Sequence, residues 1–432
     1  MNITQFTMEE VRCFAERQEF NIRPLTFLVG ENSTGKTTAL ACFQVLANYF
    51  CEREVDFNSD PYSMGTFKDI VRNSRKTEKA FTLGFTFENG EVEWTVKFVE
   101  KKDGVEPAVS SVTMKFTDGE VVFKTGDKPK RDACLVAFDE KQNQYQVDCG
   151  IDILTHLSLD IFLDFLEGQS EGKTALTKYL ETHEDSLNSI FRPWETWRTI
   201  SVFSTSPIRS RPKRTYDLTR VFDDPEGSDV PMWLIEAKAT RKKEWEALKG
   251  RLVDFGKRSG LFQNIEVKNL GGSIGNPFQL KVKVRAPNSN IIDVGYGVSQ
   301  ILPILVRILD PDIFQDRYIG KRPISLLQQP EVHLHPRAQA ELSSLLVMSA
   351  SGGGQSFIVE THSDYMIDRA RIEIKKGNIR PEDVSLIYLE PKGRVVKAHN
   401  IRFDKMGNME GVPLHYREFF MTEYRQLMGF ED

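Results

Sequence analysis

Residues 21–50 read NIRPLTFLVGENSTGKTTALACFQVLANYF, and this stretch decides the fold. An apolar run ends at Val29, a glycine-containing turn follows, and apolar residues recur at helical spacing from Thr37 onward. This order predicts a strand, a loop and a helix. Farther along, short apolar runs alternate with Gly, Asn and Asp turns over residues 80–148, which predicts antiparallel hairpins beside that core.

The loop of this unit, GENSTGKT at residues 30–37, fits the pattern G-x-x-x-x-G-K-[ST]. Its glycines allow backbone N–H groups to curl around phosphate oxygens, and the N-terminus of the following helix favours their negative charge. We expect Lys36 to reach the β- and γ-phosphates and the Thr37 hydroxyl to bind Mg²⁺. The alternative is an ordinary glycine turn with a surface lysine, but the strand–loop–helix context favours a nucleotide site.

The composition is that of a folded globular chain, since the 432 residues are 40% hydrophobic and 28% charged. The net charge is −5, so any contact with nucleic acid must come from a local basic surface. No apolar stretch approaches the ~20 residues that a membrane-spanning helix needs, and the N-terminus has no secretory pattern. Five cysteines without metal-ligand spacing predict reduced thiols and a cytoplasmic location.

A second glycine-containing element, VGYGVSQ at residues 294–300, precedes an amphipathic helical pattern. Two glycines and a serine at a helix start form either another anion-binding element or a turn that caps a core helix. One nucleotide does not need two such elements from one chain. The first interpretation therefore implies that this element serves a nucleotide held by a partner subunit.

The segment ISLLQQPEVHLHP, residues 324–336, is a short apolar strand that ends in polar residues. Nucleotide hydrolases place acidic residues there, whereas this chain has Gln328 and Gln329, and its nearest carboxylate is Glu331. An amide oxygen is a weaker ligand for Mg²⁺ than a carboxylate, and an amide cannot act as a general base. His333 and His335 in the same segment fit a structural turn better than a zinc site.

A fourth apolar run, residues 355–359, is followed by Glu360-Thr361-His362-Ser363. A histidine just after the carboxyl end of a strand is well placed to contact a γ-phosphate. The alternative role of His362 is that of an ordinary loop histidine.

In order, VGENSTGKTT, DVGYGVSQILPIL, LLQQPEVHLHPRAQAEL and FIVETHSDYMIDR resemble the ABC-type ATPases of the SMC, RecF and OLD kind. More narrowly, they are similar to stand-alone AAA-family ATPases of bacterial anti-phage systems. The resemblance implies an α/β P-loop core with an antiparallel β flank and a helical insertion, and ATP and Mg²⁺ as cofactors. It implies an N-terminal ATPase lobe over residues 1–150, a mainly helical insertion over 151–260 and a C-terminal ATPase lobe over 261–432.

The resemblance also assigns roles by position. Gln328 and Gln329 occupy the Walker B acidic pair, with Glu331 as a substitute carboxylate and His362 as the switch histidine; Thr37 and Gln328 are the implied metal ligands. The implied ATP-binding residues are the Walker A loop and a signature contributed to the opposite subunit: Gly30, Glu31, Asn32, Ser33, Thr34, Gly35, Lys36, Thr37, Thr38, Gly295, Gly297 and Ser299.

The implied function is a homodimer or higher homo-oligomer that closes around ATP and gates a separately encoded effector, a nuclease or toxin, in anti-phage defence. Relatives show Glu-Glu-Pro-Glu or Glu-Gln-Pro-Glu where this chain has Gln-Gln-Pro-Glu, which predicts slow hydrolysis. Three explanations stay open: a natural slow ATPase, use of Glu331, or an engineered Glu→Gln change that traps ATP. The alternative function is that of a RecF-like DNA-repair ATPase. The residues expected to contact phosphate or DNA form one basic cluster: Arg209, Arg211, Lys213 and Arg214.

Overall fold

The structure is a computed structural model of the chain. It describes residues 3–51, 54–73, 79–87, 90, 92–101, 105–116, 119–124, 133–138, 144–149, 201–218, 224–271, 275–285, 287–310, 323–416 and 426. Residues 151–200 of the expected helical insertion lie outside these residues, as does nearly all of the chain beyond residue 416.

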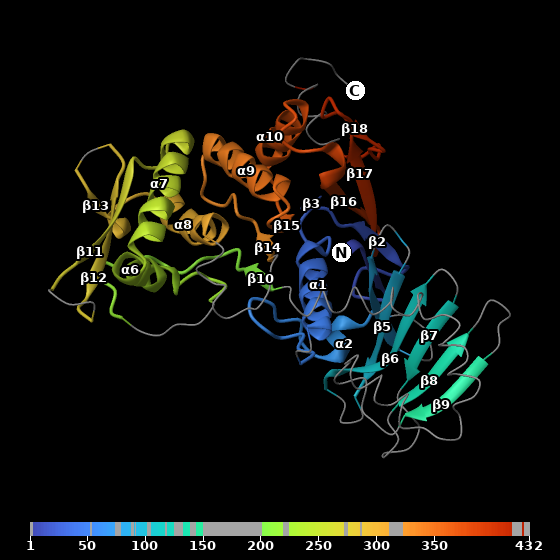
Figure 1. Cartoon of the computed structure of the whole chain (residues 1–432). Coiled ribbons are helices and arrows are strands. Elements are labelled where there is room, and N and C mark those ends of the chain that lie inside the picture. The colour runs from blue at the N-terminus through green and yellow to red at the C-terminus, as the bar shows by residue number, and fades with distance from the viewer. Residues whose placement is uncertain are drawn as a thin grey trace.

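A seven-stranded sheet forms the centre of the molecule (Figure 1). Five of its strands are parallel, and two antiparallel strands extend one edge. The strands in spatial order are β10 (Val202–Thr205), β14 (Ile324–Gln328), β15 (Ser356–Glu360), β3 (Leu25–Gly30), β16 (Val384–Lys392), β17 (Val395–Phe403) and β18 (Met409–Glu410).

β3 has apolar residues on both faces because the sheet is covered on both sides. Leu25, Phe27 and Val29 belong to one hydrophobic core, whereas Leu28 belongs to the other. The helix α1 (Lys36–Phe50) packs in the core that contains Leu28. The predicted strand, loop and helix are therefore confirmed, and both faces of the strand are buried.

The predicted hairpins form most of an eight-stranded antiparallel sheet that flanks α1, and residues 3–21 supply its other two strands (Figure 1). Its core with α1 is aromatic: the Phe43 ring lies 5.5 Å from the Phe6 ring and 5.0 Å from the Phe85 ring. The short helix α2 (Phe67–Ile70) closes the same core. The strands in spatial order are β2 (Gln18–Asn21), β1 (Ile3–Glu9), β4 (Ala80–Phe87), β5 (Val92–Glu100), β6 (Pro107–Phe116), β7 (Gly119–Lys124), β8 (Ala133–Phe138) and β9 (Gln144–Cys149).

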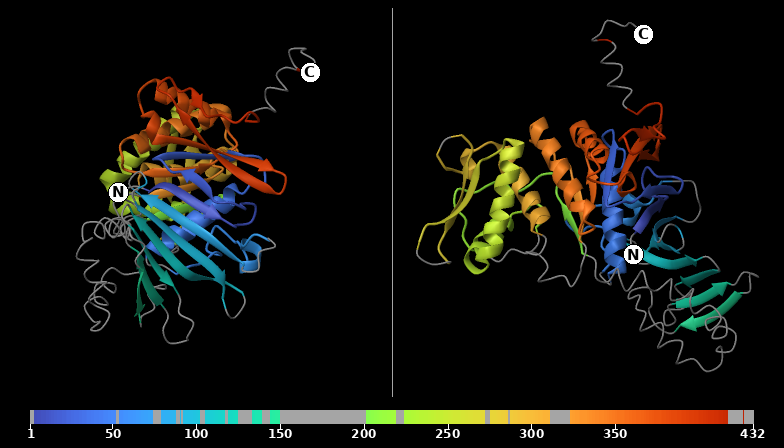
Figure 2. Two further views of the ribbon diagram at one scale, coloured as in Figure 1. Left: turned by 90° about the vertical axis from the view of Figure 1, so that its right-hand side faces the viewer. Right: turned by 45° about the horizontal axis from the view of Figure 1, so that its top comes forward.

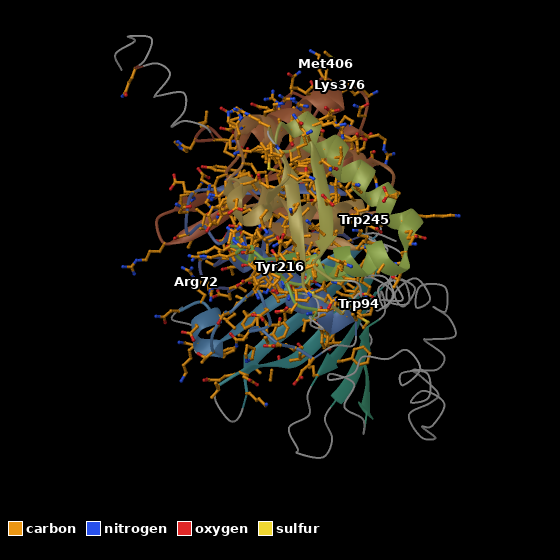
Figure 3. All side chains as sticks on the ribbon, turned by 90° about the vertical axis from the view of Figure 1, so that its left-hand side faces the viewer. Arg72, Trp94, Tyr216, Trp245, Lys376 and Met406 are labelled. Carbon is orange, nitrogen blue, oxygen red and sulfur yellow. The ribbon has the colours of Figure 1, made fainter. Side chains whose placement is uncertain are left out.

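Helices cover the opposite face of the central sheet, and two views in Figure 2 show them on the side away from the flank. Figure 3 locates Trp94 on the flank and Trp245 on a helix of the other side. The helices are α6 (Val230–Thr240), α7 (Lys242–Ser259), α8 (Tyr296–Leu309), α9 (Pro336–Ser351) and α10 (Asp364–Lys375), with the short 3₁₀ turns η2 (Ile291–Asp293) and η4 (Pro381–Asp383).

A three-stranded sheet completes this side of the molecule, with β11 (Asn264–Asn269), β12 (Phe278–Lys283) and β13 (Ser289–Asn290) in that order. One strand differs from the sequence-based expectation. β10 falls within the range 151–260, yet it pairs with β14 and so contributes to the central sheet. Among the described residues, no helix is both long and apolar enough to cross a lipid bilayer.

Candidate nucleotide site

The loop between β3 and α1 is closed by its own polar groups. The Thr34 hydroxyl donates to the carbonyl of Glu31 over 2.9 Å. The Lys36 ammonium donates to the carbonyls of Gly30 and Glu31, at 3.0 and 2.6 Å. Burial lowers the pKa of Lys36, while the carboxylates of Glu360 and Glu331 act against that shift. The loop therefore holds a buried cation at the N-terminus of α1.

Gly35 is required by the geometry of this loop. Its φ is +88°, a region that residues with a side chain rarely adopt. A Cβ atom there would lie 2.8 Å from the Cys13 sulfur and equally close to the Phe14 ring. The second glycine of the motif thus allows the loop to approach the β1–β2 connection.

The loop lines a pocket of about 410 Å³ that also receives residues from three other segments. Gln329 and His362 come from the ends of β14 and β15, as the sequence predicts. Glu360 and Arg12 complete it, and no sequence motif predicted a role for either residue. The full lining is Arg12, Cys13, Asn32, Ser33, Gly35, Lys36, Thr37, Thr38, Gln329, Glu360 and His362.

Arg12 lines the pocket and connects α1 to the loop before α2. Its guanidinium donates to the Thr38 hydroxyl over 3.1 Å and to the Met64 carbonyl over 2.9 Å. Nothing in the local sequence around Arg12 indicates this contact, because Thr38 lies in a different element.

Glu360 is the carboxylate of the pocket. The Thr37 hydroxyl lies 3.2 Å from its Oε1 and 3.0 Å from its Oε2. Burial raises the pKa of Glu360, and the contacts with Thr37 and Lys36 act against that rise. A polar residue at the end of an otherwise apolar strand was the one sequence feature that could have pointed to it.

Gln328 and Gln329 occupy different environments although they are neighbours in the chain. The Gln328 side chain is 3% exposed and does not line the pocket. Gln329 lines the pocket, has a φ of +42°, and donates its N–H to the carbonyl of Glu360 over 2.8 Å. The structure therefore places Glu360, and not the predicted metal ligand Gln328, beside Thr37.

Glu331 connects two loops and lies outside the pocket lining. Its Oε1 accepts the backbone N–H of His362 over 2.8 Å, which joins the turn after β14 to the loop after β15. Burial raises the pKa of Glu331. Burial and the nearby Lys36 charge lower the pKa of His362. Glu331, predicted as the substitute carboxylate, thus positions the backbone of His362, predicted as the switch histidine.

The basic cluster is divided by the fold. Arg209 is 2% exposed, and its Nη2 donates to the carbonyls of Gln328 and Gln329 at 3.1 and 3.2 Å. Burial lowers the pKa of Arg209 to about 10. Arg211, Lys213 and Arg214 are exposed. Arg209 therefore supports the turn after β14 rather than the surface contact expected from sequence.

The VGYGVSQ element is not brought to the pocket within one chain. Gly295 precedes α8, Gly297 approaches the chain so closely that a Cβ would lie 2.8 Å from the His333 carbonyl, and the Ser299 hydroxyl donates to the Tyr296 carbonyl over 2.9 Å. None of the three glycine and serine residues lines the pocket. α8 and α1 belong to different cores, on opposite faces of the central sheet (Figure 1).

The donors present suit Mg²⁺ and do not suit a metal held by protein alone. Thr37 and Glu360 offer hard oxygen atoms, and Mg²⁺ in nucleotide sites takes one or two carboxylates together with phosphate oxygens and water. Across the described ranges, no group of three or more His, Cys, Asp and Glu side chains could hold a metal ion. His335 instead caps α9.

Comparison with known proteins supports an ATPase in both halves of the chain. A family model described as an AAA domain matches residues 5–190, and one described as an AAA ATPase domain matches residues 235–367. The first contains the loop of β3 and α1, and the second contains α8, β14 and β15. The chain thus has an α/β core with a P-loop, and a separate AAA-type model matches each of the two parts that carry these segments. No curated protein matches the sequence.

Solved SMC head domains are similar over most of their length. One is the SMC head bound to the C-winged helix domain of ScpA, with 13% identity, a TM-score of 0.43, and coverage of 93% of this chain and 98% of that chain. The SMC head domain from Thermotoga maritima has 10% identity and a TM-score of 0.36, with coverage of 92% of this chain and 98% of that chain. A third structure is the SMC head domain with an extended coiled coil, bound to the C-terminal domain of ScpA derived from Pyrococcus furiosus. It has 11% identity and a TM-score of 0.42, with coverage of 99% of this chain and 99% of that chain.

We expect the wild-type protein to lose stability as pH rises, because the buried Glu331 becomes charged, and we expect Glu331→Gln to avoid this loss. The raised pKa of Glu331 means that the folded chain binds more protons than the unfolded chain above about pH 4.3. Its contribution to stability is therefore greatest at low pH and is lost as pH rises through the folded pKa. Glutamine keeps an oxygen for the His362 N–H and carries no charge.

The measurement is the free energy of unfolding of both proteins in urea at about pH 4 and about pH 7. The variant should gain stability relative to the wild type as pH increases. Parallel pH profiles for the two proteins would contradict the buried-charge account of Glu331.

Proposed function

We propose that this chain is an ABC-type ATPase that dimerises around ATP and gates a separately encoded effector, a nuclease or toxin, in anti-phage defence. The observation that carries the proposal is one pocket lined by Lys36 and Thr37 of the P-loop together with Gln329, Glu360 and His362. The AAA ATPase matches in both halves support it. Lys36 and the N-terminus of α1 hold the phosphates, and Thr37 contributes to Mg²⁺ binding.

A dimer follows from the position of the VGYGVSQ element. Its two glycines and its serine, Gly295, Gly297 and Ser299, lie at the N-terminal end of α8, where backbone N–H groups favour an anion. They lie on the other side of the central sheet from α1. A second copy therefore supplies the element to the pocket, and each ATP is held between two subunits.

Binding of ATP matters more than its turnover in this proposal. Gln329 is the residue of the Gln-Gln pair that lines the pocket, and an amide cannot take a proton from water. Glu331 is buried and accepts the His362 N–H, which keeps it away from the pocket. A cleavage rate limited in this way gives a long-lived ATP-bound state that suits a switch.

The effector and its trigger come from the resemblance to stand-alone defence ATPases. The RecF-like alternative requires DNA contact, for which Arg211, Lys213 and Arg214 are exposed candidates. Arg214 is engaged with Asp293, so its guanidinium is shared between that pair and any phosphate. No specific observation favours this alternative over the switch.

We expect Mg²⁺ and ATP to shift the wild-type protein toward a dimer in analytical ultracentrifugation. Lys36→Ala and Gly295→Arg should each abolish the shift, because each removes one half of the composite site; Gly295 is exposed, and a side chain there has open space. Mixing the two variants should restore part of it, since their heterodimer contains one intact site. Ser351→Arg, an exposed residue at the end of α9, is the control and should behave as wild type. An unchanged shift in Gly295→Arg would refute the composite site.

We expect wild-type turnover below ~1 s⁻¹, the lower end for typical enzymes. Gln329→Glu adds a second carboxylate to the pocket lining and should raise turnover about 100-fold or more, the usual range of general-base effects. Gln355→Glu, at the residue directly before β15 and outside the pocket lining, is the matched control. Fast wild-type hydrolysis in a phosphate-release assay would contradict the proposal.

We expect a stoichiometric nuclease or toxin to co-purify with the tagged wild-type chain from its native host in the presence of ATP. Lys36→Ala should recover less of it, because the gated state requires bound nucleotide. Mass spectrometry identifies the partner. Recovery of recombination factors, with DNA binding by the purified chain that weakens steeply with salt, would favour the RecF-like alternative instead.

A further inference from the structure

Gln328 and Glu360 face each other across two neighbouring strands. β14 and β15 run parallel, and these two residues are register partners. Leu326 and Ile358, two positions earlier, both belong to the core that contains α1. Side chains two residues apart in a strand share a face, so the amide and the carboxylate both point toward α1.

The Gln328–Glu360 pair carries a single negative charge, and a second charge at these two positions would be unfavourable. Adjacent strands lie about 4.8 Å apart, so carboxylates at both positions would be close, buried and repulsive. Glutamine at 328 beside glutamate at 360 avoids that cost. A carboxylate is therefore retained at the carboxyl end of the sheet, on the strand next to the one where hydrolases usually place it.

A side chain at the end of β15 lies closer to Thr37 than one at the end of β14. It pairs directly with β3, with Glu360 opposite Leu28, whereas β15 separates β14 from β3. The Glu360 carbonyl also accepts the Gln329 N–H over 2.8 Å, which fixes the backbone at the strand end. Both carboxylate oxygens consequently lie within 3.2 Å of the Thr37 hydroxyl.

We infer that Glu360 exchanges roles with Gln328 and is the carboxylate that holds Mg²⁺ with Thr37 at the ATP site. The inference rests on the proposed function, because it takes the pocket to be an ATP site. Glu360 supplies the charged oxygen ligand, Thr37 supplies the hydroxyl, and Lys36 stays with the phosphates. The amides at 328 and 329 then remove the general base but leave metal binding intact.

The test measures binding and not catalysis. The affinity of the full chain for a non-hydrolysable ATP analogue is determined with Mg²⁺ and with EDTA, and the ratio gives the contribution of the metal. For the wild type this ratio should be at least about tenfold, and Glu360→Gln should reduce it to about one. Binding in EDTA should be unchanged or tighter in the variant, since a negative charge near the phosphates is removed.

Two further variants sharpen the result. The exchange Gln328→Glu with Glu360→Gln should recover part of the Mg²⁺ effect, whereas Gln328→Glu with Glu360 retained should not exceed the wild type. Glu390→Gln is the matched control. Glu390 is a buried carboxylate on β16, the other neighbour of β3, and it is bonded to His399 outside the pocket. Its variant should keep the wild-type ratio.

Each outcome decides between the two proposals. ATP binding in EDTA, with an equal Mg²⁺ effect in the wild type and Glu360→Gln, would overturn this inference and leave the proposed ATP site standing. A wild type that binds no nucleotide under either condition would refute the proposed function. An exchange variant no better than Glu360→Gln would overturn the exchange of roles. If Glu360→Gln fails to fold, Glu360→Asp keeps the charge on a shorter side chain and should lose part of the ratio.

Discussion

The burial of α1 between two sheets is the constraint on which the rest of the site depends. The aromatic contacts of Phe43 with Phe6 and Phe85 fix the helix against the flank, and the central sheet covers its other side. Its N-terminus is thereby held at the carboxyl ends of the parallel strands. Lys36 and the positive end of the helix dipole meet the ends of β14 and β15 there.

The same packing gives the two buried glutamates near the pocket, Glu331 and Glu360, different partners. Glu331 is used in the contact with His362, and Glu360 is directed toward Thr37. Gln329 and His362 are the neutral polar residues that the ends of β14 and β15 add to the pocket. In the proposed site, Glu360 serves metal binding, and the amides at 328 and 329 leave no general base at the usual positions. The proposed site therefore suits holding ATP more than consuming it.

The opposite faces of the central sheet carry complementary halves of the proposed composite site. α1 presents the loop on one side, and α8 presents Gly295, Gly297 and Ser299 on the other. Arg209 joins the two sides, because its backbone N–H donates to Gln300 in α8 and its guanidinium bonds the carbonyls of Gln328 and Gln329.

The sequence by itself determined the parts of the protein that are local. Residues 30–37 form a contiguous motif, and the short alternating runs over 80–148 form hairpins, because each pattern reflects neighbours along the chain. Only the tertiary structure decided that Glu360 contacts Thr37 across 323 residues and that Arg209 is buried. Strand order and the packing of distant segments set those contacts, and neither leaves a local pattern of residues from which it can be predicted.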